Sequence, residues 1–193
     1  MPGILGKKLG MTRLIQDDGR VIPFTVVECE PNEIVQVKTT EKDGYPAVVL
    51  GFSKLHKPAK NKKFHFVREF RVDGSATPKM GDFVTVDLFQ ENETVKITAV
   101  SKGKGFQGVV KKYHFAGGCA SHGSHNHREP GSIGARAKPG RVCKGKKLPG
   151  RMGGETITIR ETQVVYLNKD KNLIGIKGQI PGGNGHLVII RKQ

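Results

Sequence analysis

Hydrophobic and polar residues alternate in two separate parts of the chain. In the first part this pattern predicts strands at residues 21–28, 34–38, 45–52, 66–72, 83–89 and 94–100, with short polar turns between several of them. In the last of these segments Val95, Ile97 and Ala99 are separated by polar residues. This alternation is typical of a strand that buries one face in a core.

The strand-like pattern returns near the C-terminal end, at residues 155–160, 163–167, 173–177 and 187–191. We therefore predict a mainly β protein in which residues 1–100 and 154–193 together form one β-barrel domain. Only residues 53–63 are predicted to be helical, and no internal repeat is evident.

Residues 101–153 interrupt this pattern and cannot build a core of their own. Only 9 of these 53 residues are large and apolar, and 12 are glycine. A disordered linker is the simplest interpretation, but three Pro-Gly pairs predict fixed turns with a positive φ at glycine. The segment is therefore predicted to be an insertion bent at Pro130-Gly131, Pro139-Gly140 and Pro149-Gly150, disordered in isolation and ordered by an external partner.

The charge of the chain is concentrated in the same segment. Lys and Arg number 33 against 17 Asp and Glu, which gives a net charge of +16. Residues 101–153 hold 12 of the basic residues and one acid, Glu129, and thus contribute +11 of that charge. Such an excess indicates a polyanionic partner, and glycine allows the backbone to approach phosphate groups closely. We predict that the segment binds nucleic acid and passes between RNA helices.

The predicted RNA-binding residues share a cationic or imidazole side chain, suited to phosphate contacts and to stacking on bases. They lie near the N-terminus or in the insertion: Lys7, Lys8, Arg13, Lys102, Lys104, Lys111, Lys112, His114, His122, His125, His127, Arg128, Arg136, Lys138, Arg141, Lys144, Lys146, Lys147 and Arg151.

The cysteine and histidine residues of the insertion are candidates for a zinc site or a thiol active site. Cys119 and Cys143 flank three histidines, but no CxxC pair occurs and the spacing matches no common zinc finger. A catalytic pair would also need more rigid support than this segment offers. We therefore predict no metal, no catalytic residue and no cofactor, although a zinc-dependent or thiol enzyme stays as an alternative.

Glycine-rich motifs do not change this view. The segment from Gly3 to Lys8 lacks the spacing and the hydroxyl residue of a phosphate-binding loop, and Gly103 to Gly108 lacks a βαβ context. Three cysteines in irregular positions argue against a secreted disulfide framework. No secretory signal and no long apolar stretch is evident, so we expect a cytoplasmic protein with no membrane partner and no small-molecule substrate.

Four long motifs stand out along the chain: GILGKKLGMT from Gly3, SKGKGFQG from Ser101, HR followed by PGSIG from His127, and PGRV running on to PGRMG from Pro139. Together they closely resemble the bacterial large-subunit (50S) ribosomal protein L-three family, the universal uL-three family. The resemblance covers essentially the whole chain.

This resemblance implies a translation-protein-type β-barrel on the surface of the large-subunit rRNA. It also implies a long extension toward the peptidyl transferase centre, with its tip near Ser132 to Lys138. Members of the family bind 23S rRNA directly, act early in subunit assembly, contact neighbouring ribosomal proteins and catalyse nothing. A basic chromosomal or general nucleic-acid-binding protein is the alternative that explains the charge but not the ordered turns.

A few positions depart from the family pattern. Ala137 replaces a glutamine that is methylated in some bacterial members, so that modification is not expected. Cys119 and Cys143 stand where proline and an aromatic residue are common, and Glu129 places an acid in a phosphate-binding arm.

Overall fold

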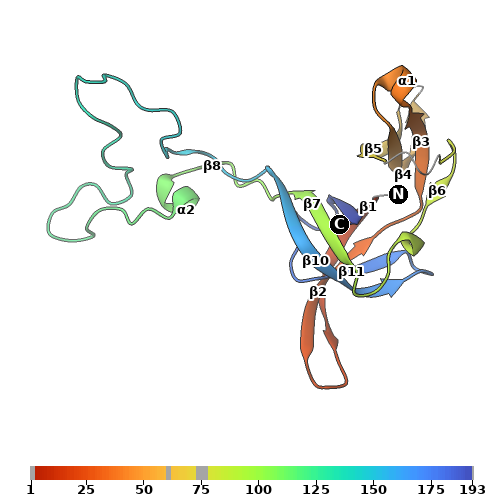
Figure 1. Cartoon of the computed structure of the whole chain (residues 1–193). Coiled ribbons are helices and arrows are strands. Elements are labelled where there is room, and N and C mark those ends of the chain that lie inside the picture. Colours follow the sequence, from red (N-terminus) through yellow and green to blue (C-terminus); the bar gives the residue numbers. More distant parts are fainter. Residues whose placement is uncertain (1–2, 60–61, 73–77, 193) are drawn as a thin grey trace. The chain divides into compact units, whose positions relative to one another are not determined.

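The computed structural model describes residues 3–59, 62–72 and 78–192. Strands account for 48% of the chain and helices for 7%, which confirms the predicted mainly β class. The chain divides into two compact units (Figure 1). Unit 1 consists of Met1–Ser101 and Thr156–Gln193, and unit 2 consists of Lys102–Glu155.

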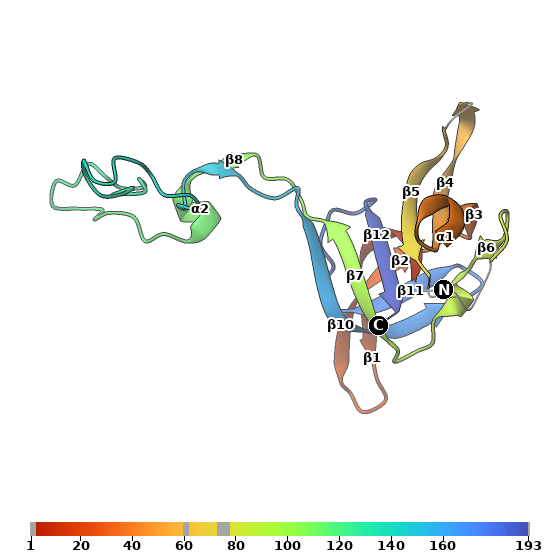
Figure 2. The same cartoon turned by 45° about the horizontal axis from the view of Figure 1, so that its top comes forward.

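Six strands of unit 1 form a closed antiparallel barrel, seen from two directions in Figures 1 and 2. Strand β1 pairs with β12 along one edge and with β2 along the other, so the sheet closes and every strand of the barrel is paired on both edges. In the order of their pairing the strands are β1 (Gly3–Ile15), β12 (Leu187–Lys192), β7 (Thr94–Val100), β10 (Thr156–Asn168), β11 (Leu173–Lys177) and β2 (Val21–Glu28).

Alternate residues of these strands fill the barrel. On β7, Val95 and Ile97 are fully buried and Ala99 is almost so. Gly6 on β1 lies against the same interior, where a Cβ atom would be only 2.5 Å from the sulfur of Cys29. A side chain at this position would therefore collide with the buried end of β2 and the residues that follow it.

A second sheet in unit 1 has the strand order β5 (Lys62–Arg71), β4 (Ala47–Ala59), β3 (Asn32–Lys38) and β6 (Phe83–Val84). The short helix α1 (Thr40–Asp43) connects β3 to β4, and the 3₁₀ turn η1 (Val86–Leu88) follows β6. Leu50 and Phe70 of this sheet belong to the same hydrophobic cluster as Ile4 and Ile190 of the barrel. Unit 1 therefore has one continuous core.

The predicted helix at residues 53–63 is wrong. Its described residues lie in β4 and β5, which pair as a ribbon from Lys54↔Phe64 to Ala59↔Lys62, while residues 60 and 61 lie outside the described part of the chain. Pro58 has no N–H to donate within a helix, and the alternating exposure of Ser53 to His56 follows the period of a strand.

The predicted strand at residues 83–89 is correct only at its start. After Val84 pairs with Asn32, the chain has reached the beginning of β3 and turns into η1. Val86 and Phe89 are buried all the same. An alternating pattern shows which side chains are buried, but a strand also needs a partner for its backbone groups.

Two other differences concern the barrel strands. The alternating pattern does not predict β1, because the glycines and lysines of this strand hide the alternation. The two strands predicted at residues 155–160 and 163–167 form the single strand β10. Its register shifts between Ile159 and Thr162, where Glu161 has a positive φ of 59°. This bulge separates two segments that each alternate regularly.

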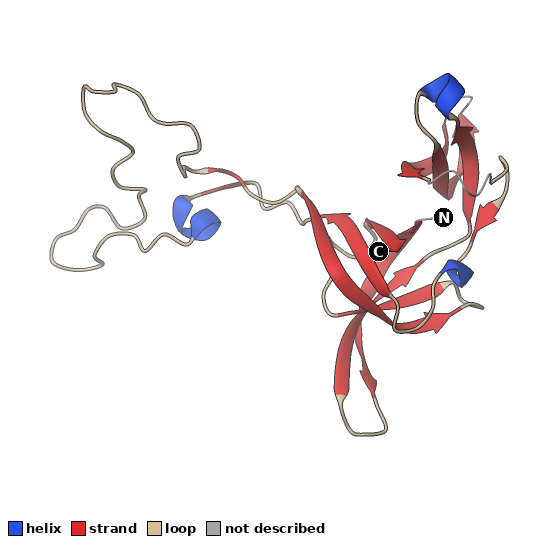
Figure 3. Ribbon diagram, viewed as in Figure 1, coloured by secondary structure: helices blue, strands red, loops and turns tan. Residues whose placement is uncertain are grey.

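Unit 2, all of whose residues are described, consists mainly of loops (Figure 3). Its regular elements are β8 (Phe106–Gln107), α2 (Val109–Tyr113) and β9 (Gly150–Arg151). Among the described residues, no helix combines the length and apolar character needed to cross a membrane.

Candidate nucleic-acid interface

The basic side chains of unit 2 face solvent. All are exposed except Lys112, which is half-buried beside an aromatic ring: Lys102, Lys104, Lys111, Lys112, Arg128, Arg136, Lys138, Arg141, Lys144, Lys146, Lys147 and Arg151. Glu129 is exposed among them. A chain that presents so many cations without a core of large apolar side chains is suited to bind along a polyanion.

A short antiparallel stem closes the base of unit 2. Phe106 pairs with Arg151, and the backbone N–H of Lys104 donates to the carbonyl of Met152 at 2.9 Å. The N–H of Met152 donates in turn to the carbonyl of Gly105, also at 2.9 Å. The stem thus places Lys104 and Arg151, two of the predicted RNA-binding residues, on its two opposing chain segments.

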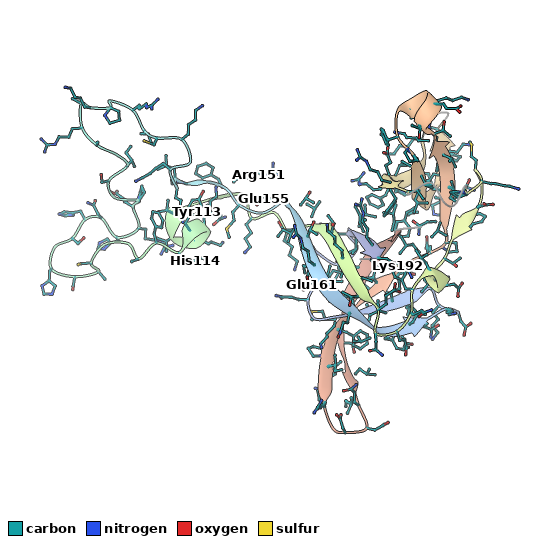
Figure 4. The ribbon with its side chains drawn as sticks, in the orientation of Figure 1. Tyr113, His114, Arg151, Glu155, Glu161 and Lys192 are labelled. Atoms are coloured by element: carbon teal, nitrogen blue, oxygen red, sulfur yellow. The ribbon has the colours of Figure 1, made fainter. Side chains whose placement is uncertain are left out.

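Helix α2 ends in the aromatic ring of Tyr113, labelled in Figure 4, and two cations lie near this ring. The Nζ atoms of Lys112 and Lys147 lie 5.1 Å and 5.8 Å from the ring centroid of Tyr113. The ring of Phe115 lies 6.1 Å from that of Tyr113. Fully buried Val109 anchors the first turn of the helix. Ammonium groups around an aromatic face form a site on which a nucleobase can stack beside neutralised phosphates.

Tyr113 was absent from the predicted RNA-binding residues. The sequence offered one signal for it, because Tyr113 directly follows Lys111 and Lys112 in a segment with few large apolar residues. Lys147, by contrast, is distant in sequence, and only the structure brings it to the ring.

The histidines do not form one cluster. His127 approaches the other side of its loop, because its Nδ1 lies 3.0 Å from the carbonyl oxygen of Cys119 and its own carbonyl accepts from the N–H of Gly118 at 3.2 Å. His114, His122 and His125 are exposed. Among the described residues, no group of three or more His, Cys, Asp or Glu side chains is placed to hold a metal ion.

The predicted positive φ is confirmed at two of the three Pro-Gly pairs, but the chain forms a turn only at Pro139-Gly140, since residues 129–133 are neither a turn nor a bend. Gly131 and Gly140 have φ values of 74° and 68°. Gly150 lies instead in β9, paired with Gln107, and is not among the glycines with positive φ. Its place in a ladder requires extended backbone, so the third turn prediction is wrong.

The predicted RNA-binding residues near the N-terminus belong to unit 1 and differ in exposure. Lys7 and Arg13 are exposed on β1. Lys8 is only 8% exposed, and its Nζ donates to the carbonyl oxygens of Ile180 at 2.6 Å and Gly182 at 3.1 Å. Because its ammonium group is engaged inside unit 1, we remove Lys8 from the candidate interface.

The three cysteines are free thiols in different surroundings. Cys29 is fully buried, and burial raises the pKa of its thiol far above the usual value, with a smaller contribution from Glu28. A thiol held protonated in a core is chemically inert. Cys119 and Cys143 are exposed in unit 2.

Comparison with known proteins identifies the family. A family model described as "Ribosomal protein L3" matches residues 36–179. The "Large ribosomal subunit protein uL3" of Desulfotalea psychrophila is 47% identical over 204 residues and covers 98% of both chains. Its namesake from Dehalococcoides mccartyi is 46% identical over 199 residues, covering 98% of this chain and 97% of its own length. These matches confirm the resemblance, and the chain belongs to the ribosomal protein L3 family.

Proposed function

We propose that this protein is a structural constituent of the large ribosomal subunit that binds 23S rRNA directly. The printed names of its relatives support a ribosomal role in translation. The family is structural and not enzymatic, as expected. Since the large subunit of bacteria is cytoplasmic, we assign the protein to the cytoplasm.

The composition and exposure of unit 2 carry the proposal of direct rRNA binding. Residues 101–153 contribute +11 of the net charge of +16 on a segment with 12 glycines. Ordering such a segment requires an external partner, because few apolar groups are available to offset the loss of conformational entropy. Folded rRNA supplies both the negative charge and the crevices that a glycine-rich backbone can enter.

Within this proposal the two units have different roles. Unit 1, as a translation-protein-type barrel, rests on the surface of the rRNA, and residues 101–153 form the extension that penetrates it toward the peptidyl transferase centre. The exposed cations of unit 2 and the Tyr113 ring with its two lysines are the proposed contacts. Neighbouring large-subunit proteins are further partners.

We also propose a role early in subunit assembly. A basic segment that becomes fixed by the RNA around it neutralises phosphate repulsion where RNA helices approach one another. Binding before those helices close would give the segment access to positions that are enclosed later.

Sedimentation of a cell lysate tests the proposed location. The protein is expected to comigrate with large subunits, and RNase but not DNase should abolish this comigration. A basic chromosomal protein, the second candidate that the charge allows, would give the opposite nuclease sensitivity. Comigration that survives RNase would contradict both.

A further inference from the structure

The strand β5 lies at an edge of the four-stranded sheet. The sheet order is β5-β4-β3-β6, so within the described part of the chain β5 pairs with β4 on one side and terminates the sheet on the other. It spans Lys62–Arg71, ten residues, which is long for an edge strand. A long edge presents a row of backbone donors and acceptors that another chain can use.

The backbone groups on this edge can be assigned residue by residue. The N–H of Val72 donates to the carbonyl of Pro46 at 3.3 Å, and the register between β4 and β5 is unbroken from there to Phe66. Hydrogen-bonded residues alternate with residues whose backbone groups point away from the partner strand. Val67, Glu69 and Arg71 therefore direct their N–H and C=O groups to the open edge. The Val67 carbonyl already accepts a bond from the Arg68 side chain at 2.9 Å.

Each face of the sheet has a cavity that residues of β5 help to line. On one face Phe66 and Arg68 line a cavity of about 430 Å³ together with Val100, Leu187 and Ile189 of the barrel. On the other face a cavity of about 600 Å³ is lined by seven residues of β3 and β5, Ile34 and Val67 among them, with Met80 and Gly81.

An added strand would meet both cavities at once. Its side chains would alternate between the two faces, with successive residues directed into opposite hollows. Main-chain hydrogen bonds would provide affinity, and the cavity lined by Phe66, Leu187 and Ile189 would select apolar side chains on one face, as in other cases of strand addition. RNA has neither a strand backbone that can extend the hydrogen-bond ladder nor apolar side chains at every second position. The edge therefore favours a polypeptide over RNA as its partner.

The charge of the edge limits the chemistry of the added strand. Strand β5 contains one acid, Glu69, and four basic residues, namely Lys62, Lys63, Arg68 and Arg71. Lys38 neutralises that acid, since its Nζ lies 2.7 Å from the Glu69 carboxylate. A second copy of this chain would bring the same cations edge to edge, which opposes self-association. A partner strand with acidic residues would be attracted.

We propose that the open edge of β5 binds an extended segment of a partner protein in which apolar and acidic residues alternate. The segment adds to the sheet as a fifth strand, with its apolar side chains on the face of the cavity beside Phe66 and its acidic side chains on the opposite face, the side of Lys62 and Lys63. This inference concerns residues of unit 1 and does not depend on rRNA binding by unit 2.

Fluorescence anisotropy with the full-length chain tests the proposal. The probe is a labelled octapeptide of alternating valine and glutamate. One control peptide carries lysine in place of glutamate, and a second is N-methylated at alternate amides so that one of its edges cannot donate. The valine-glutamate peptide should bind at least about tenfold more tightly than either control.

Two variants locate the site. Val67→Pro removes an N–H that faces the open edge and leaves the β4 ladder intact, so the sheet should stay folded. It is expected to weaken peptide binding at least about tenfold, and Arg68→Glu about fivefold or more. Lys177→Glu, which makes the same charge change at an exposed position of β11, is the matched control and should leave binding unchanged.

Amide exchange of the unmodified chain gives an independent measurement. Added peptide should slow exchange at Val67, Glu69 and Arg71. Equal binding of all three peptides, or equal affinity of the Arg68 and Lys177 variants, would overturn the proposal. Protection of these amides by a single-stranded RNA octamer and not by the peptide would also overturn it, and would assign the edge to RNA.

Discussion

The ammonium group of Lys8 lies 2.6 Å from the carbonyl oxygen of Ile180, a residue 172 positions later in the chain. The same group reaches the carbonyl of Gly182 at 3.1 Å. These bonds join β1 to the turn that leads into β12, the strand that pairs with β1. Lys8 thus holds two segments of unit 1 together, whereas its neighbour Lys7 is exposed.

Lys8→Met should therefore destabilise unit 1. The substitution keeps an unbranched side chain but leaves two carbonyl groups without their charged donor, which typically costs about 2 to 4 kcal/mol. Urea unfolding of the two proteins measures this difference. Lys7→Met serves as the matched control and should change stability by less than about 0.5 kcal/mol. An unchanged unfolding midpoint together with weakened RNA binding would show that the Lys8 ammonium contacts RNA.

Gly6→Ala and Gly10→Ala should differ although both lie on β1. A Cβ atom at Gly6 would lie 2.5 Å from the Cys29 sulfur and 2.6 Å from a Val27 methyl group, whereas at Gly10 the nearest neighbouring atom is 3.9 Å away. Overpacking of this kind costs about 1 to 3 kcal/mol. Thermal unfolding should show a clear loss for Gly6→Ala and little change for Gly10→Ala. Equal effects would mean that β1 does not pack closely against the end of β2.

Glu69 should contribute stability that depends on pH. Hydrogen bonds from Lys38 and then Tyr45 lower the pKa of the Glu69 carboxyl in the folded state. Its contribution is therefore present above the unfolded-state pKa of about 4.3 and is lost as pH falls through the lower folded value. Glu69→Gln should be less stable than the unmodified chain at neutral pH, and the difference should vanish in acid. Glu91→Gln, at an exposed carboxylate, controls for charge alone.

Removal of residues 117–150 should leave unit 1 folded. The hydrophobic cluster that contains Ile4, Phe70 and Ile190 includes no residue of unit 2. A short Gly-Ser linker in place of the deleted residues should preserve the circular dichroism of the strands and cooperative unfolding, while subunit maturation is impaired. Loss of the cooperative transition would show that the deleted residues support the core.

The sequence predicts buried faces better than it predicts strand boundaries. Val95, Ile97 and Ala99 alternate and are buried as expected, but Val86 alternates equally well and lies in a 3₁₀ turn. Burial is a property of the side chain, whereas a strand also depends on a partner elsewhere in the chain. For the same reason β1 was missed, because Gly6 is buried without contributing hydrophobicity.

The candidate interface shows a similar limit. Local composition identifies the cations of residues 101–153, since each is visible in the sequence by itself. It cannot show that Lys147 lies beside Tyr113 or that Lys8 is internal, because both facts depend on contacts between distant residues.

Tyr113→Leu should weaken rRNA binding more than Tyr113→Phe. Phenylalanine keeps the ring beside Lys112 and Lys147, whereas leucine removes the stacking face. Loss of one stacked base typically costs about 1 to 3 kcal/mol. Filter binding of a 23S rRNA fragment measures both variants. Equal losses would argue that the hydroxyl or the lysines, and not the ring, make the contact.

The salt dependence of rRNA binding tests directly whether unit 2 neutralises rRNA phosphates. The association constant of the full-length protein is measured over a series of salt concentrations and compared with two variants. Each variant has four basic residues replaced by glutamine, in unit 2 at Arg136, Lys138, Lys144 and Lys146, and in unit 1 at the exposed Lys42, Lys79, Lys171 and Lys177.

The unmodified protein should lose affinity steeply as salt rises, because each phosphate contact releases counterions. For the unit 2 variant the logarithmic slope should become shallower by about 0.7 to 0.9 for each contact removed. The unit 1 variant should keep the original slope. If the two variants instead had the same slope as the unmodified protein, these cations of unit 2 would not contact rRNA.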